Sequence, residues 1–222
     1  MSIQTLITGT GSCIPSTVKS NETFLDHQFL NTDGTPFSGD NREIIKKFHA
    51  ITGIEERRYV SPSKNASDLA VIAALAAIES AAIDKETLDY IVVAHNFGDV
   101  KTGSVQGDML PSLASKVKNN LHISNPNCVA YDLLFGCPGW VQGVIQAEAY
   151  LKSGMAKKVL VIGTEALSRV TDPSDRDSMI YADGAGACVL ESKTDRHGFG
   201  VLSHAAQTFA GEEVDYLFFG PS

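Results

Sequence analysis

The chain has 222 residues, of which 43% are hydrophobic, and this is enough to bury a core of ordinary size as one large domain or two small ones. Its formal net charge of −8 argues against a general nucleic-acid-binding protein, because contacts with phosphate need clustered Lys and Arg. No apolar run is long enough to cross a bilayer and the N-terminus lacks the features of a secretion signal, so we expect a cytoplasmic location without a membrane partner.

Apolar, β-branched segments predict the strands. The first, Ile3–Thr8, is followed by Gly9-Thr10-Gly11, for which we expect a tight turn. A dinucleotide-binding loop is the weaker interpretation, because a third glycine in register is missing and Pro15 interrupts the helix that should follow. Continuous apolar runs, typical of strands buried on both faces, follow at Ile91–Ala94, Cys128–Phe135 and Val159–Ile162.

Helical segments lie between these strands. Asn65–Ala82 is rich in Ala and apolar almost all round, which predicts a buried helix. Pro111–Asn120 has helical periodicity, and Cys137–Ser153 predicts a third helix that Gly154 ends in the C-cap position.

Two further strands, Ala187–Glu191 and Gly200–Ser203, are expected without a helix between them, and Asn31–Asn41 and Thr171–Asp177 are expected to be polar loops. Strands and helices therefore alternate first, and strands alone follow. This order predicts an α/β fold with a mixed, mostly parallel sheet that carries helices on both faces.

The four cysteines lie far apart in the sequence, at Cys13, Cys128, Cys137 and Cys188. They form no C-x-x-C pair and no matching His spacing, so we expect neither a metal site nor a disulfide framework. A buried, reduced Cys behaves as a small hydrophobe, and this is the default interpretation of all four.

Cys137 is the candidate exception, because it lies between a predicted strand and a predicted helix. Gly136 makes the turn, and Pro138 suits the first helical position, where its missing N–H is not needed. The free N–H groups and the partial positive charge at a helix start stabilise a thiolate and also an oxyanion on an attacked thioester carbonyl. From spacing alone, a nucleophilic and a structural role both stay open.

The segment Leu134–Trp140 resembles the active-site turn of the β-ketoacyl-ACP synthase III group of thiolase-like condensing enzymes. The resemblance runs through nearly the whole chain, in the same order, at Thr8–Pro15, Thr52–Arg57, Ile91–Ala94, Lys152–Arg169, Asp172–Arg176 and Asp183–Ala187.

The resemblance implies a thiolase-like fold of two similar halves, of which residues 1–222 would be the N-terminal domain, with the C-terminal half absent from this chain. It also implies an acyltransferase. Acyl-CoA or acyl-ACP would acylate Cys137, and malonyl-ACP would then lose CO₂ so that its carbanion attacks the acyl-enzyme. Family members place the His and Asn that promote decarboxylation in the second half, so we expect the chain to be incomplete for turnover. His95 and His204 are expected to be partly buried and satisfied by neighbours.

The same resemblance implies partners: an acyl carrier protein, the missing half, and a second copy in a homodimer. Large apolar patches seldom stay bare, which supports self-association. No cofactor beyond the acyl thioester substrate is implied.

The resemblance also implies further site residues. Asn96 and Leu167 match positions that line the acyl pocket of the family, and Arg176 matches an arginine that contacts the CoA adenine region. Lys47 and Ile51 stand where CoA-using members often carry Trp and Arg. Losing a stacking ring and a phosphate-binding cation favours an acyl-carrier-protein donor or a specialised pathway.

Two rival functions stay open. A Cys hydrolase with a strand-turn-helix elbow would need Gly where Phe135 stands, and Asp172 and His204 follow in the required order without a supporting motif. A non-catalytic binding or assembly module would leave Cys137 inert.

The large Phe135 and Trp140 lie beside Cys137 in the sequence, where the family often has smaller residues or Phe, and this indicates a reshaped site.

Overall fold

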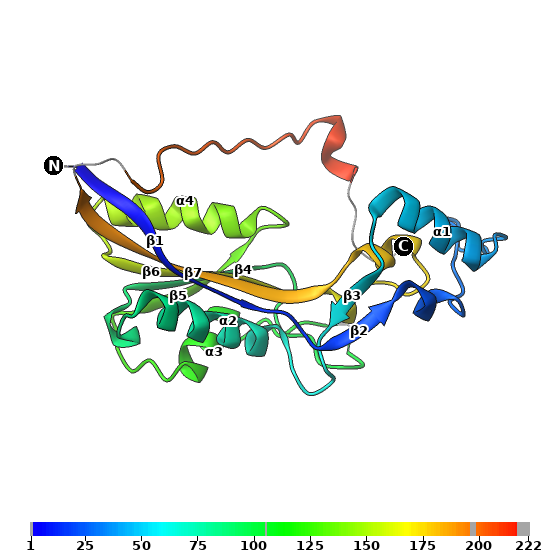
Figure 1. Cartoon of the computed structure of the whole chain (residues 1–222), viewed down its shortest axis with the longest axis horizontal. Coiled ribbons are helices and arrows are strands. Elements are labelled where there is room, and N and C mark those ends of the chain that lie inside the picture. Colours follow the sequence, from blue (N-terminus) through cyan, green and yellow to red (C-terminus); the bar gives the residue numbers. More distant parts are fainter. Residues whose placement is uncertain (1, 105, 196–198, 217–222) are drawn as a thin grey trace.

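The computed structural model describes residues 2–104, 106–195 and 199–216, and its main feature is a five-stranded sheet in the order β1-β7-β6-β4-β5 (Figure 1). The strands are β1 (Ser2–Cys13), β4 (Tyr90–His95), β5 (Val129–Leu134), β6 (Lys158–Ala166) and β7 (Asp183–Asp195). Strand β4 runs parallel to β5 and β6, whereas β7 runs antiparallel to β6 and β1. The sheet is mixed, as expected, but parallel pairings do not predominate. No α-helix separates β6 from β7, and a parallel neighbour needs such a crossover.

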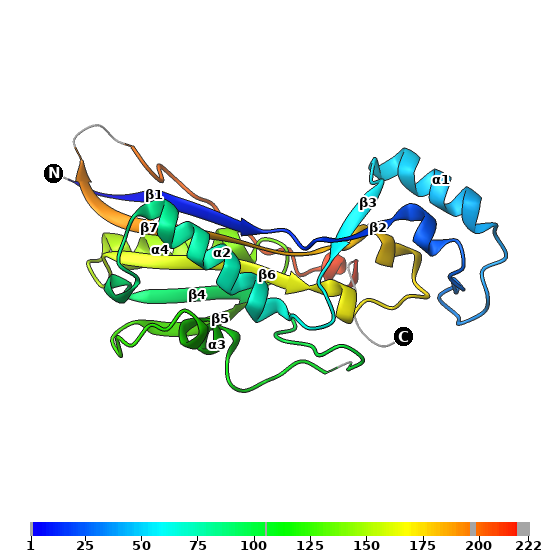
Figure 2. The same cartoon turned by 60° about the horizontal axis from the view of Figure 1, so that its bottom comes forward.

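Helices cover both faces of this sheet, as predicted. Helices α2 (Ala66–Ala81) and α3 (Leu113–Asn120) lie on one face and α4 (Gly139–Lys152) lies on the other (Figures 1 and 2). Alternate residues of β4 serve the two faces: Ile91 and Val93 pack under α2, and Val92 packs under α4. The apolar runs of the sequence are therefore strands buried on both sides.

The expected turn at Gly9-Thr10-Gly11 is wrong, because β1 continues through it to Cys13. Both glycines face α2. A Cβ on Gly9 would lie 2.3 Å from the carbonyl oxygen of Ala77, and one on Gly11 would lie 2.2 Å from that of Ala73. The glycines therefore let a helix approach a strand closely rather than let the chain turn.

A small lobe extends from one end of the main sheet and was not expected from the sequence. It holds α1 (Asn41–Thr52) and an antiparallel pair of strands, β2 (Thr17–Ser20) and β3 (Glu56–Tyr59) (Figure 2). Gly53 ends α1 in the left-handed conformation, with φ of 69°.

The lobe is tied to the rest of the molecule by Arg57, whose side chain is only 4% exposed. Its guanidinium donates to the carbonyl oxygens of Met179 (3.0 Å) and Lys19 (3.1 Å) and to Asn21 Oδ1 (2.6 Å). It also lies over the ring of Phe24, at 5.0 Å.

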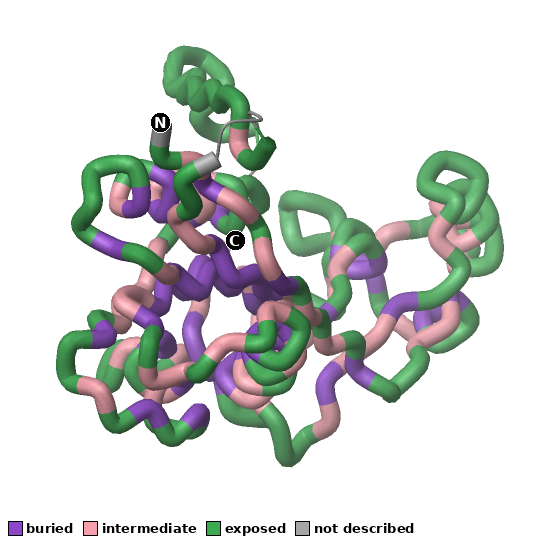
Figure 3. Tube along the Cα trace, turned by 60° about the vertical axis from the view of Figure 1, so that its left-hand side comes forward, coloured by how far each residue is buried: buried purple, intermediate pink, exposed green. Residues whose placement is uncertain are grey.

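The strand expected at Gly200–Ser203 is absent from the described segment 199–216, which runs as an extended chain along α4 and ends in a short 3-10 helix, η5 (Glu212–Asp215) (Figure 1). One backbone hydrogen bond, from Val201 N–H to the Thr5 oxygen at 2.9 Å, joins it to β1. A strand needs a ladder of such bonds. Most of this segment and of the small lobe is exposed, whereas buried residues gather in the main sheet and α2 (Figure 3). Within the described residues, no helix has both the length and the apolar character needed to cross a membrane.

Candidate active site

Cys137 is exposed and lies in the turn between β5 and α4. The helix itself begins two residues later than expected, at Gly139, with Pro138 in the N-cap position. The N–H of Gly139 donates to the Gly136 oxygen at 2.8 Å, which closes the turn. Cys137 therefore lies two residues before the first helical residue of α4, near the first turn, where N–H groups have no partner inside the helix.

A pocket of about 340 Å³ opens beside Cys137, where the carboxyl ends of β4, β5 and β6 meet the start of β7. Cys137, Asn96 and Leu167 all line it, so the structure brings together three of the four predicted site residues. The other lining residues are Ala94, His95, Phe135, Gly136, Trp140, Gly163, Thr164, Glu165, Gly184, Ala185 and Gly186. Most are small or apolar, which is typical of small-molecule sites.

Arg176 does not line this pocket. It begins a 3-10 helix, η4 (Arg176–Ile180), and its guanidinium carbon lies 4.3 Å from the centre of the Phe37 ring. Arg176 thus has Phe37 of the small lobe as its aromatic neighbour.

Glu165 is a pocket residue that sequence reasoning missed. Its Oε1 accepts the backbone N–H groups of Asn96 (3.1 Å) and Phe97 (3.5 Å), and its Oε2 lies 3.5 Å from Asn96 Nδ2. Burial raises the pKa of this carboxyl, although these donors and His95 oppose the rise. Glu165 therefore fixes the loop after β4, and with it Asn96, from the neighbouring strand β6. The sequence did offer a signal for Glu165, because a charged residue that follows a predicted buried strand is a candidate for a site at the strand ends.

His95 also lines the pocket, and it is buried as expected. Its Nδ1 accepts the N–H of Gly98 at 3.0 Å, so the proton of the neutral ring is on Nε2. Nε2 lies 3.0 Å from Asp132 Oδ2, although the N–H is not aligned for a full hydrogen bond. Both ring nitrogens are engaged by the fold, so this histidine is not presented to Cys137 as a base.

Asp132 is held as a carboxylate between β5 and the start of α3. Burial favours its neutral form, but His95 and two backbone N–H groups of α3, at 2.7 and 2.8 Å, outweigh burial and lower its pKa. The dyad of His95 and Asp132 therefore stabilises the strand ends beside the pocket.

His204 lies far from Cys137. Its Nδ1 is 2.8 Å from Glu148 Oε2, and Lys152 pairs with the other oxygen of that carboxylate. Glu148 follows the start of α4 by nine residues, or about 14 Å along the helix axis. A catalytic triad of Cys137 with His204, which the hydrolase interpretation needs, is not formed.

The other three cysteines lie in surroundings that make their thiols less reactive. Burial raises the pKa of Cys13 and of Cys128, and it raises that of Cys188 to about 12. In the part of the chain that the structure describes, no group of three or more His, Cys, Asp and Glu side chains could hold a metal ion.

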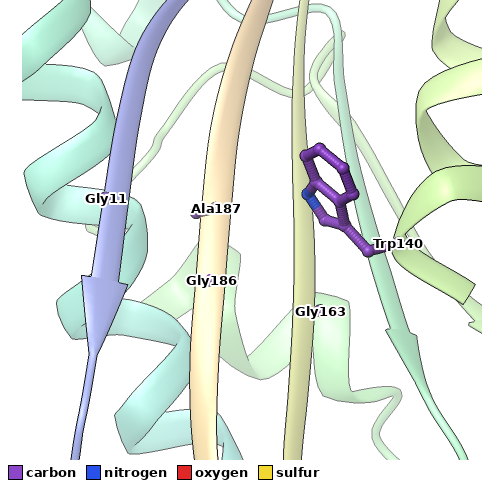
Figure 4. A pocket seen from close by; sticks show the side chains of 5 residues that line it. All are labelled: Gly11, Trp140, Gly163, Gly186 and Ala187. Atoms are coloured by element: carbon purple, nitrogen blue, oxygen red, sulfur yellow. The ribbon is translucent and has the colours of Figure 1, made fainter. Parts of the chain in front are cut away.

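A second, shallower hollow of about 240 Å³ adjoins the pocket on the face of the sheet that α4 covers. Gly11, Gly163, Gly186 and Ala187 form its floor, and the indole of Trp140 stands over it (Figure 4). Burial raises the pKa of Cys188 on β7, and the neighbouring Trp140 side chain partly opposes that rise.

Known proteins resemble this chain over most of its length. A family model described as 3-oxoacyl-[acyl-carrier-protein (ACP)] synthase III matches residues 131–209. A β-ketoacyl-[acyl-carrier-protein] synthase III 1 of Vibrio parahaemolyticus is 39% identical over 185 residues, which are 83% of this chain and 51% of that protein. The corresponding protein of Vibrio cholerae is 38% identical over 89% of this chain and 54% of its own length.

Solved structures agree. The crystal structure of 3-oxoacyl-[acyl-carrier-protein] synthase III from Aquifex aeolicus superposes with a TM-score of 0.68 and 31% identity over 86% of this chain and 55% of that one. The priming β-ketosynthase of the R1128 polyketide pathway superposes with a TM-score of 0.69 and 26% identity, over 86% and 50%. The chain thus spans about half the length of the relatives it matches. By sequence and by fold, this chain is similar to about half of a thiolase-like 3-oxoacyl-[acyl-carrier-protein] synthase III.

Proposed function

We propose that this chain carries the acyl-accepting site of a 3-oxoacyl-ACP synthase III-type acyltransferase, with Cys137 as the nucleophile. The observation that carries the proposal is the position of Cys137, which is exposed, lies two residues before the start of α4 and lines the pocket. In the step, the sulfur attacks the carbonyl carbon of an acyl thioester, the carrier thiol leaves and takes up a proton, and the acyl group stays on sulfur. Unpaired N–H groups of the first turn of α4 are suited to stabilise the oxyanion.

The acyl donor that we propose is an acyl-carrier thioester rather than acyl-CoA. The guanidinium of Arg176 is already stacked on Phe37, so an adenine ring would have to compete for one of its faces. Ile51 is neutral where CoA-using relatives often have a cation. An acyl carrier protein brings its own surface contacts and needs neither residue.

The second step, condensation with malonyl-ACP, needs a group to promote decarboxylation. We propose that a complementary thiolase-like half provides it, since His95 is engaged by Gly98 and Asp132. Without that half, the acyl group would stay bound to Cys137 as a stable acyl-enzyme.

We also propose that the molecule associates through β5. This strand forms one end of the sheet order, and Val129 and Leu134 on it are 47% and 70% exposed. Exposed apolar edge strands tend to pair with another chain. Sedimentation equilibrium tests this: a concentration-independent monomer at micromolar concentration would contradict it.

Intact-mass measurement after incubation with butyryl-ACP tests the nucleophile. We expect the parent chain and the control Cys13→Ala to gain one acyl group, and Cys137→Ala to gain none. Acylation that survives in Cys137→Ala, or a parent chain that accepts no acyl group from ACP or CoA, would overturn the proposal.

The same incubation separates the rival functions. A thioester hydrolase would release free acid in many turnovers and show little acyl-enzyme, whereas acyl capture gives a stable adduct. A binding module would give neither product.

A further inference from the structure

The pocket beside Cys137 and the hollow over the glycine floor are neighbouring spaces that share three residues: Trp140, Gly163 and Gly186. Trp140 lies three residues after Cys137, in the first turn of α4. Trp140 therefore stands beside the pocket that Cys137 lines, at the residues where this pocket adjoins the hollow.

Trp140 lies close to strand β6 of the sheet. Gly163 lies under it, and a Cβ at that position would lie 3.2 Å from Trp140 Cβ, which is tighter than nine in ten real contacts of a Cβ. Glycine at position 163 therefore lets the start of α4, and Trp140 with it, lie this close to the sheet.

The floor beside the indole is open. Gly186 is paired with Gly163 across β7 and β6, so both positions face α4. A Cβ on Gly186 would meet no atom within 4 Å. All residues that line the hollow are apolar or glycine, so the space is suited to methylene groups rather than to polar ones.

We propose that Trp140, lying over Gly163 and Gly186, is the residue that determines acyl-chain length at this site. The inference rests on the proposed acylation of Cys137. In the parent chain the indole closes the pocket, so a short acyl group fits and a longer one meets the ring. Without the indole, the pocket and the hollow merge, and a longer acyl chain continues over the glycine floor.

Competition between acyl donors tests the inference. Equal concentrations of acetyl-, butyryl-, hexanoyl-, octanoyl- and decanoyl-ACP are offered to the full chain, and intact mass gives the distribution of acyl groups on Cys137. Each methylene that gains apolar contact favours binding by about fourfold. We expect Trp140→Ala to raise the octanoyl-to-butyryl ratio by about tenfold or more.

Gly186→Val should act in the opposite direction, because its side chain enters open space that the acyl group would occupy. It is also expected to fold, so it tests the floor even where Trp140→Ala is unstable. In the double variant the ratio should fall back toward the parent value. Ala182→Val, an exposed position just before β7, is the matched control and should leave the ratio unchanged.

A spectroscopic measurement accompanies the competition. Trp140 is the only tryptophan of the chain, so its fluorescence should change when Cys137 is acylated and should change more with hexanoyl than with acetyl groups. If the parent chain accepts no acyl group, the proposed function fails and this inference fails with it. If all variants are acylated with the same length preference, or the fluorescence is insensitive to acyl length, only the present inference is overturned.

Discussion

Glu165 shares the pocket with Cys137, and its ionisation can be followed through stability. Burial raises its pKa, so the native state binds the proton more tightly than the unfolded chain does. Its contribution to the free energy of unfolding therefore falls as pH rises from the ordinary glutamate pKa of about 4.3 through the raised value. Glu165→Gln lacks this loss. We therefore expect the unfolding free energy of the variant minus that of the parent to increase as pH rises across this window.

Urea denaturation at a series of pH values measures that difference. Gln still offers an oxygen to the N–H groups of Asn96 and Phe97, so the loop should stay in place. The prediction would be contradicted if this difference does not change with pH, or if it decreases as pH rises.

The four cysteines should differ in their reaction with iodoacetamide. Cys137 is exposed, whereas burial raises the pKa of the other three thiols. At neutral pH we expect Cys137 to be alkylated first, with Cys188 the slowest. Peptide mass spectrometry over time gives the order, and prior labelling of Cys128 or Cys188 in the folded chain would count against the structure.

At the scale of elements, the contact between β1 and α2 depends on missing side chains. Gly11→Ala would force its Cβ to within 2.2 Å of the Ala73 oxygen, so the helix and the strand must separate. We expect Gly11→Ala to lower the free energy of unfolding by about 3 kcal/mol. Gly186→Ala, also in a strand but facing open space, should change it by less than about 1 kcal/mol. Equal effects in urea denaturation would show that the loss comes from glycine in general and not from this contact.

At the scale of the whole molecule, Arg57 joins the small lobe to η4. Arg57→Lys keeps the charge but cannot reach the oxygens of Met179, Lys19 and Asn21 together, so we expect a loss of about 2–4 kcal/mol. The neighbouring Arg58 is the control. It pairs with Glu56 at the surface, and Arg58→Lys should cost less than about 0.5 kcal/mol.

Limited proteolysis locates the effect of Arg57→Lys. If Arg57 anchors the lobe, cleavage should speed up first within residues 17–59, because local opening frees that part before the main sheet. Uniform acceleration over the whole chain would indicate global destabilisation instead.

Local sequence patterns were sufficient for the main elements. The apolar runs predicted β4, β5 and β6, the Ala-rich segment predicted α2, and the turn at Cys137 was found within two residues of the observed start of α4. These features depend on contacts near in sequence: a buried strand needs an unbroken apolar run, and a helix start needs a suitable turn. The single-domain organisation of residues 1–222, the absence of a cofactor and the cytoplasmic location stay predictions.

The missed features depend on contacts far apart in sequence. Small-lobe strands have little apolar patterning, and what fixes them is the burial of Arg57 against Met179, which lies 122 residues away. The glycines of β1 resembled a turn until α2 was packed on them, and Gly200–Ser203 has strand composition but no ladder to join.

The sequence by itself indicated Cys137 as the candidate nucleophile, because strand, turn and helix start are encoded by adjacent positions and because Leu134–Trp140 resembles a known active-site turn. Only the tertiary structure decided its surroundings. Parallel pairing of β4 and β6 brings Asn96 to Glu165, and pairing of β6 with β7 lays Gly163 beside Gly186 under Trp140. The register between strands distant in sequence sets these contacts, and a pattern of neighbouring residues does not encode that register.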